Sequence, residues 1–423
     1  MPAASVEKTI EAVWRIEQAR IIAAIARMVR DVGLAEEFAQ DALVTALAQW
    51  PEKGMPDKPA AWLMATGKRR AIDHLRRAKM LDRKHGQIGH EMEIEQMHGG
   101  ADIDAALDDD IGDDLLSLIF TACHPVLSPE ARVALTLRLV GGLDTEEIAR
   151  AFLVPEPTVA QRIVRAKRTL AQAGVPFEVP RGADRAERLA SVLFVIYLVF
   201  NEGYSATSGE DWIRPQLCEE AMRLGRVLAG LVPEEAEIHG LVALMEIQAS
   251  RLKARTGPGG APILLADQNR GRWDRVLIQH GLASLDRSEA LATRRGPYAL
   301  QAAIAACHAR APTADETDWP RIAALYFALA QVNPSPVVEL NRAVAISMAF
   351  GPQAGLDLVD QLVDVPELKA YHLLPGVRAD LLAKLGRLEE AAAEFQRAAS
   401  LTRNDRERAV LLERAAAMAV RPD

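Results

Sequence analysis

Cysteine is scarce in this sequence, with three residues among 423, widely spaced and odd in number. Because disulfide frameworks and cysteine-based zinc sites need paired cysteines, this scarcity argues against both and favours a reducing compartment. Long apolar runs are also missing. The longest, residues 189–200, has 12 residues, whereas a membrane-spanning helix needs about 20, so we expect a buried helix there. The first residues contain no apolar signal core. We therefore expect a cytoplasmic protein without membrane contact.

Motifs that carry catalysis are missing as well. The sequence has no phosphate-binding glycine loop, no nucleophile elbow and no HExxH zinc motif. His85, His90 and His98 lie near acidic residues, but their spacing matches no metal-ligand pattern. An enzyme with its active site in the loops at 198–214 or 262–275 would lack a recognisable acid–base set. We therefore expect no enzymatic activity, no cofactor and no metal.

Helix-favouring residues dominate the chain. Alanine, leucine, arginine and glutamate are abundant, whereas aromatic residues form only 5% of the sequence, so we expect an all-α protein. A chain of 423 residues is too long for one ordinary core, and two to four domains are expected. Gly33 should interrupt the first helical pattern, and Gly67 is a possible second break. The expected parts are a helical domain at 5–82, a flexible acidic linker at 83–112, a second small helical unit at 113–175 and a helix-rich extension at 185–420.

Charge is distributed unevenly along the sequence. The net charge is −8, yet residues 66–84 contain eight basic side chains against two acidic ones. Residues 91–114 contain ten acidic side chains and no lysine or arginine. The basic cluster has no obvious intramolecular partner, apart from Asp73 as a local one for the arginines. A basic block beside an acidic one is typical of a surface that grips phosphates and a charged tether.

Residues 143–170 have the pattern of a helix–turn–helix. Asp144 is a predicted N-cap with Glu147 as its capping-box partner. The second helix should bury Val159, Ile163 and Val164. Its outward face then holds side chains suited to base edges and phosphates; a basic surface hairpin is the alternative. These outward residues are Thr158, Gln161, Arg162, Arg165 and Arg168.

Three stretches in order resemble the extracytoplasmic-function (ECF) sigma factors of the sigma-70 family. DVGLAEEFAQDALVTALAQW is similar to region 2.2, which docks on core RNA polymerase. AWLMATGKRRAIDHLRR is similar to regions 2.3–2.4, and GLDTEEIARAFLVPEPTVAQRIVRAKRTL to region 4.2, which reads the −35 element. The resemblance covers roughly residues 10–175 and implies two small helical sigma domains with core RNA polymerase and promoter DNA as partners.

The resemblance also implies roles for individual side chains. Glu37 and Asp41 would face the polymerase, although a solvated helix face explains them nearly as well. Trp62 would stack on unpaired promoter bases, or else be a core residue between helices. The residues expected to contact the −10 element are Trp62, Lys68, Arg69, Arg70, Arg76 and Arg77.

The remainder resembles the C-terminal extension of one sigma subgroup, which is a tetratricopeptide-like helical array. The clearest helix pair lies at 371–401, with Ala391 and Phe395 at the expected spacing. Residues 251–275 should be a long surface loop. The resemblance implies an interaction role, with a protein or a small-molecule signal as partner. Seven loop residues could line a ligand pocket, but capping and stitching of the array is favoured: Asn201, Glu202, Tyr204, Asp267, Arg270, Trp273 and Asp274.

A second function fits part of these patterns. A helix–turn–helix regulator with a tetratricopeptide-like effector domain would bind DNA without binding polymerase. Such a regulator would not need the basic helix at 61–77 and the acidic helix before it. That pair of helices therefore favours the sigma factor.

Overall fold

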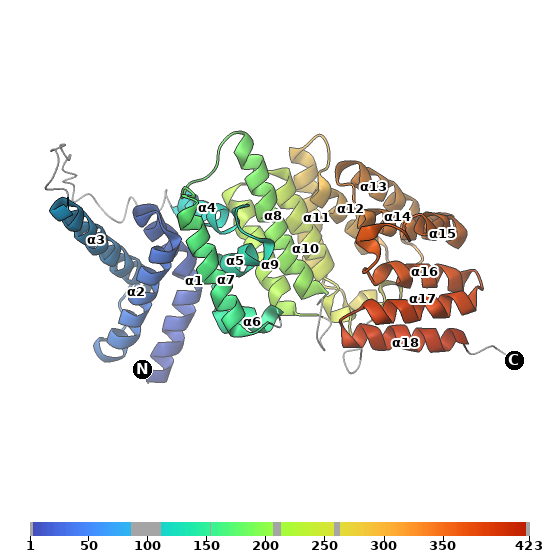
Figure 1. The fold of residues 1–423 in the computed structure, drawn as a ribbon, viewed down its shortest axis with the longest axis horizontal. Coiled ribbons are helices and arrows are strands. Elements are labelled where there is room, and N and C mark those ends of the chain that lie inside the picture. The colour runs from blue at the N-terminus through green and yellow to red at the C-terminus, as the bar shows by residue number, and fades with distance from the viewer. Residues whose placement is uncertain (1–2, 86–110, 153, 206–212, 258–262, 420–423) are drawn as a thin grey trace. The chain divides into compact units, whose positions relative to one another are not determined.

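The protein is described here by a computed structural model covering residues 3–85, 111–152, 154–205, 213–257 and 263–419 (Figure 1). Within these ranges the secondary structure is helical and contains no strand, which confirms the all-α expectation. Contacts divide the chain into two compact units, Met1–Val195 and Ile196–Asp423.

The first part of unit 1 is a three-helix assembly. The expected interruption between the first two helices is present, but it lies at Arg30, whose φ is 53°, and Gly33 lies in the first turn of the next helix. Asp31 caps that helix by accepting hydrogen bonds from the amides of Gly33 and Leu34 at 2.7 and 3.0 Å. The three helices are α1 (Ala3–Val29), α2 (Val32–Lys53) and α3 (Pro59–His85).

Helix α3 is continuous through Gly67. A Cβ atom on Gly67 would lie 2.7 Å from the Ile25 side chain. The missing side chain therefore allows α1 and α3 to approach closely, and the glycine does not break the helix. Leu63 and Ala71 are fully buried on the same side of α3.

The second part of unit 1 contains the expected helix–turn–helix. The amide of Asp144 donates to the Glu147 carboxylate at 2.9 Å, and the amide of Glu147 donates to the Asp144 carboxylate at 2.7 Å. This reciprocal pair confirms the predicted capping box. Gly142 ends the preceding π-helical turn with a φ of 78°. The elements are α4 (Ile111–Ala122), α5 (Pro129–Thr136), η1 (Leu137–Gly141), α6 (Thr145–Phe152) and α7 (Glu156–Gln172).

The apolar run at 189–200 forms part of the buried helix α8 (Ala183–Tyr204), as expected. The beginning of α8 packs inside unit 1: Arg188 donates to the carbonyl of Phe120 at 3.1 Å, and Ser191 donates to that of Cys123 at 2.6 Å. The expected start of the extension at 185 therefore falls within a helix that contributes to unit 1. No helix in the described ranges is long and apolar enough to span a membrane.

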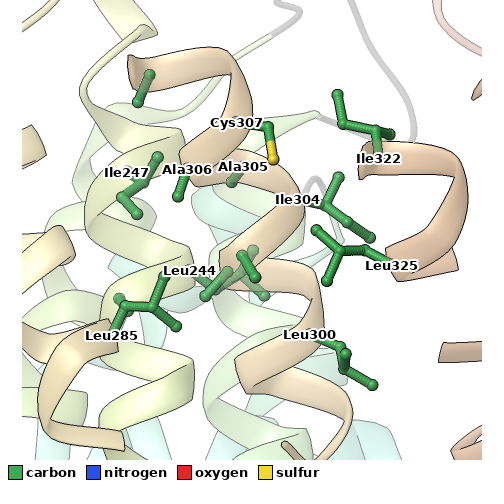
Figure 2. Packing of buried hydrophobic residues seen from close by; sticks show 14 of the residues in the cluster. Leu244, Ile247, Leu285, Leu300, Ile304, Ala305, Ala306, Cys307, Ile322 and Leu325 are labelled. Carbon is green, nitrogen blue, oxygen red and sulfur yellow. The ribbon is translucent and has the colours of Figure 1, made fainter. Parts of the chain in front are cut away.

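Unit 2 is a series of helices in which each packs against the next. Its central core joins α10 to α13 through leucine, isoleucine and alanine side chains such as Leu244, Leu285, Leu300 and Ile322 (Figure 2). The helices after α8 are α9 (Pro215–Leu231), α10 (Ala236–Ala249), α11 (Arg275–Leu291), α12 (Pro297–Arg310), α13 (Trp319–Val332), α14 (Pro336–Phe350), α15 (Pro352–Asp360), α16 (Leu373–Lys384), α17 (Leu388–Leu401) and α18 (Asp405–Ala419).

The helix pair expected at 371–401 is present as α16 and α17. Gly386, with a φ of 78°, lies in the turn between them. Ala391 and Phe395 are fully buried, and α17 packs against both α16 and α18. The spacing of these apolar residues therefore marks the face that neighbouring helices cover.

The segment between α10 and α11 is only in part the surface loop that its composition suggests, since Lys253, Asp267 and Arg272 are exposed but other side chains are buried. It contains short 3₁₀ turns, and Ala254 and Trp273 are 1% and 3% exposed and belong to the central core. Arg255 and Arg270 are also buried, at 6% and 9% exposed. Its described residues therefore attach an irregular segment to the core through a few buried side chains.

Candidate nucleic-acid interface

Helix α7 presents a basic face to solvent. Its inward side is formed by Val159, Ile163, Ala166 and Leu170, all at most 6% exposed. Val164 was expected to be buried with them but is 64% exposed, because α5 and α6 cover only one side of the helix. Of the residues expected to face the −35 element, Thr158 and Arg162 are half-buried, and Gln161, Arg165 and Arg168 are exposed.

The basic cluster on α3 is mostly exposed. Arg69, Arg76 and Arg77 all lie on the surface. Asp73 is 4.0 Å from Arg76, a weak pair because both side chains are solvated. This agrees with the expected local role of Asp73. The three arginines leave a positively charged stretch of α3 available to a phosphate backbone.

Arg70 has a partner that the sequence did not reveal. Its guanidinium donates to the Asp41 carboxylate at 2.8 Å and to the Thr45 hydroxyl at 3.0 Å, both on α2. Arg70 was expected to contact DNA and Asp41 to contact polymerase, but in this structure the two side chains form an ion pair with each other. The two residues are 29 positions apart, so only the packing of α2 on α3 brings them together.

Lys68 is separated from the other basic residues of α3. It is half-buried, and burial together with Arg27 lowers the pKa of its ammonium, while Asp114 partly restores it. Arg27 and Asp114 themselves form an ion pair at 3.4 Å. Lys68 therefore lies beside the junction of α1 and α4 rather than in the exposed row of arginines.

Trp62 is half-buried at the start of α3. Its ring meets the edge of the buried Trp50 ring, with centroids 5.3 Å apart and planes at 71°, a favourable arrangement for aromatic pairs. Trp62 thus anchors α3 on α2 while part of its ring remains accessible. Both expected roles, core anchor and stacking surface, remain compatible with this position.

Helix α2 carries two adjacent glutamates in different surroundings. Glu37, expected to face the polymerase, is exposed. Glu36 is buried and accepts a hydrogen bond from Arg138 at 2.7 Å and another from Lys167. Sequence reasoning missed Glu36, although helical spacing puts it with Val32 and Ala39 on the inward side of α2. Glu36 links the first part of unit 1 to the helix–turn–helix part.

A cleft of about 380 Å³ lies beside this link. Glu37 and Gln40 of α2 line one side, and Ala160 and Val164 of α7 line the other. The exposed apolar side of α7 therefore faces the α2 surface expected to meet the polymerase. The cleft separates the two surfaces, and Glu37 stays exposed.

Metal and thiol chemistry find little support in the described part of the chain. No group of three or more His, Cys, Asp or Glu residues that could hold a metal occurs there. His90, His98 and most of the acidic linker at 83–112 lie outside the described residues. The three cysteines are free and buried, and burial raises the pKa of each thiol, which suppresses the reactive thiolate.

The seven loop residues of the extension act largely as structural contacts. Asp274 caps α11 by accepting from two backbone amides. Glu202 pairs with Arg214. Arg270 donates to two backbone carbonyls and one hydroxyl, Asp267 is exposed, and Asn201 is half-buried. The preference for capping and stitching is thus confirmed for Glu202, Arg270 and Asp274.

Comparison with known families explains the two-part unit and its basic helices. The sigma-70 region 2 model matches residues 14–80, and the sigma-70 region 4 model matches residues 117–170. The chain belongs to the sigma-70 family and is an ECF-like member with a C-terminal extension. A family of unknown function (DUF6596) matches residues 188–289, at the start of that extension.

Two relatives are similar to different shares of the chain. An uncharacterized protein of Rhizobium meliloti (strain 1021) is 45% identical over 390 residues, which are 92% of this chain and 90% of the relative. The probable ECF RNA polymerase sigma factor SigI of Mycobacterium tuberculosis, in strains CDC 1551 / Oshkosh and ATCC 25618 / H37Rv, is 26% identical over 184 residues. That second match covers 42% of this chain and 59% of SigI. The first similarity therefore extends through the extension.

Proposed function

We propose that the protein binds core RNA polymerase, directs it to a promoter and opens the DNA at initiation, while the extension adjusts this activity. The observation that carries the proposal is that both matched sigma regions present an exposed basic helix: Arg69, Arg76 and Arg77 on α3, Arg165 and Arg168 on α7. The polymerase would supply the chemistry, so the chain itself needs no catalytic residue or cofactor. These partners imply a cytoplasmic location.

The region 2 part would bind polymerase through α2 and the −10 element through α3. Glu37 is exposed and ready for such a contact. Asp41 and Arg70 neutralise each other across 2.8 Å, so each must release the other before meeting polymerase or DNA. This exposed pair stabilises by only about 0–1 kcal/mol, which makes the exchange inexpensive. Trp62 and Lys68 would join the −10 contact from the edges of the exposed arginines.

A transcription assay tests the proposal. Purified protein and core polymerase should start run-off transcripts from a defined promoter. If no stable complex with core polymerase forms, the proposed function is wrong. Promoter binding by the protein alone, without such a complex, would instead support the helix–turn–helix regulator with a tetratricopeptide-like effector domain.

Reading of the −35 element is tested through Arg165. Arg165→Ala should weaken promoter binding by about 1–3 kcal/mol if the guanidinium contacts a guanine. Arg150 is a matched control because it is exposed on α6 and pairs with Glu146 at 3.4 Å. Arg150→Ala should leave binding unchanged. Unaltered promoter selectivity in Arg165→Ala would remove this residue from the interface.

The extension would act as a tetratricopeptide-like array that receives a protein or small-molecule signal. Its helices stack in sequence order, which is the arrangement that exposes long binding surfaces in helical repeats. A chain ending after Tyr204 keeps the contacts that α8 makes within unit 1. That shortened chain should give a transcript yield different from the full chain. Equal yields under all conditions would show that the extension has no regulatory role.

A further inference from the structure

Three arginines and two aromatic rings gather at the beginning of unit 2. The guanidinium carbon of Arg251 lies 5.8 Å from the ring centres of both Tyr204 and Trp273. Arg255 stacks on Tyr204 at 3.5 Å, and Arg270 lies 4.9 Å from the centre of Trp273. We call these five residues the arginine–aromatic cluster. All five lie within the stretch matched by the family of unknown function.

Arg270 and Arg251 lack an ionic partner in the described part of the chain. Arg270 donates to the carbonyls of His308 and Ala311 and to the hydroxyl of Thr317, all neutral acceptors. The Arg251 guanidinium makes ring contacts but no hydrogen bond or ion pair in the described part of the chain. Glu316 acts on Arg270 only at longer range. Burying charge without an ionic partner is costly, and this cost applies to Arg270, which is 9% exposed.

The positive charge of the cluster lowers the pKa values of nearby basic groups. Burial and the nearby Arg251 lower the pKa of Arg255 and of Arg270. Burial, Arg251 and Arg270 lower the pKa of His308 to about 4. Repulsion among the cations therefore favours any negative charge that enters the cluster.

A second observation also calls for an acceptor. Trp273 is 3% exposed, and its indole N–H is buried without a hydrogen-bond partner. Buried donors in folded proteins are nearly always paired. The cluster thus combines the Arg251 guanidinium and the Trp273 N–H, two donors that have no protein acceptor in the described structure.

We propose that the arginine–aromatic cluster binds a small ligand carrying an oxyanion group, a phosphate or a carboxylate, and that Arg251 is its main binding residue. A guanidinium offers two parallel N–H groups to such an oxyanion. Arg255 and Arg270 are held by protein groups and act by keeping the local potential positive. The site goes beyond the proposed function: it would give the extension a chemical signal to sense.

Ligand titration of the full chain tests the site. Thermal unfolding is followed with inorganic phosphate and, separately, with succinate, each balanced with sodium chloride to constant ionic strength. At least one anion should raise the unfolding midpoint in a saturable manner, because a ligand that binds only the folded state stabilises it. Which anion acts distinguishes a phosphate from a carboxylate ligand. No saturable effect of either anion would overturn the proposal.

Variants separate binding from a purely structural role. Arg251→Gln should weaken the effective anion at least tenfold, whereas Lys253→Gln, at an exposed position in the same turn, should not. Arg251→Lys keeps the charge but loses the paired donors, and serves if the glutamine variant does not fold; it too should bind more weakly. If the Arg251 variants respond as the parent does, the arginine only joins the rings of Tyr204 and Trp273.

The imidazole of His308 provides a spectroscopic check. An anion that neutralises Arg251 should raise the pKa of His308, measured by NMR titration with and without the effective anion. The shift should be absent in Arg251→Gln and present in Lys253→Gln. Stabilisation of the protein without any shift at His308 would place the anion elsewhere and overturn the assignment. This readout does not involve polymerase, so its failure is distinct from failure of the proposed function.

Discussion

Glu36 is the residue whose replacement tests the structure of unit 1 most directly. Its side chain is 6% exposed and lies between Arg138 of η1 and Lys167 of α7, each 24% exposed. Glu36→Gln keeps the size of the side chain and one acceptor oxygen but removes the charge. The change leaves two partly buried cations without their shared anion.

The expected loss of stability follows from this burial. Removing one partner of a fully buried ion pair costs about 3–5 kcal/mol, and a hydrogen bond to a charged group contributes about 1.5–3 kcal/mol. Both cations retain some contact with water, so we expect about 2 kcal/mol for Glu36→Gln. For a unit of this size, that corresponds to a fall of about 4–8 °C in the unfolding midpoint.

Glu37 supplies a matched control on the same helix. Glu37→Gln makes the same chemical change at an exposed position, so its midpoint should equal that of the parent protein. Calorimetry of the two variants measures this difference. Hydrogen exchange should also accelerate in α7 of Glu36→Gln alone, because the lost contact holds α7 against α2. Binding of core polymerase should show the reverse order of effects: Glu37→Gln should weaken the complex more than Glu36→Gln does.

Two results would refute this reasoning. If Glu36→Gln and Glu37→Gln unfold at the same temperature, the buried ion pair does not hold the two parts of unit 1 together. If exchange in α7 stays slow in Glu36→Gln although the midpoint falls, Glu36 stabilises α2 locally and does not link it to α7.

Three further predictions concern pH, thiol reactivity and backbone conformation. Folding lowers the pKa of His308 from 6.5 to about 4, so between these pH values the unfolded chain binds a proton that the folded chain does not. The contribution of His308 to the free energy of unfolding should be full above pH 6.5 and fall by about 3 kcal/mol toward pH 4. Urea titrations of His308→Gln should show a flatter dependence of stability on pH. The three buried thiols, with the pKa of Cys218 raised to about 12, should not react with a disulfide reagent until the chain unfolds, and fast reaction of the native protein would contradict their burial. Gly142→Ala should destabilise somewhat more than Gly174→Ala in thermal unfolding. Both glycines have positive φ, but at Gly142 the new Cβ would lie 2.4 Å from the amide nitrogen of Gln18, a buried side chain that would have to shift.

Local patterns in the sequence predicted several elements correctly. The capping box of Asp144 and Glu147, the buried run at 189–200 and the helix pair at 371–401 all depend on residues a few positions apart. Such patterns are visible in the sequence because helix geometry relates residues three and four positions apart. The same rule could have found Glu36, since it shares its side of α2 with alanines and a valine.

Errors arose where one element covers another. Val164 has the spacing of a buried residue, yet α5 and α6 do not reach it. Gly67 has the composition of a helix break, yet it is where Ile25 of α1 approaches α3. In both cases the local pattern identifies an unusual position, but the neighbouring helix decides whether that position is exposed, as at Val164, or closely packed, as at Gly67.

The amino-acid sequence alone determines the helices, their caps and the basic faces of α3 and α7. Helices and caps depend on residues close in the sequence, and the exposed basic side chains are stabilised by water. The pairing of charges depends on the folded chain. Arg70 meets Asp41 across 29 positions, and Glu36 meets Arg138 and Lys167 across 102 and 131. No periodic pattern extends over such separations, so these contacts form only when the helices pack. The packing also decides which arginines stay exposed and which, like Arg70, already have a partner.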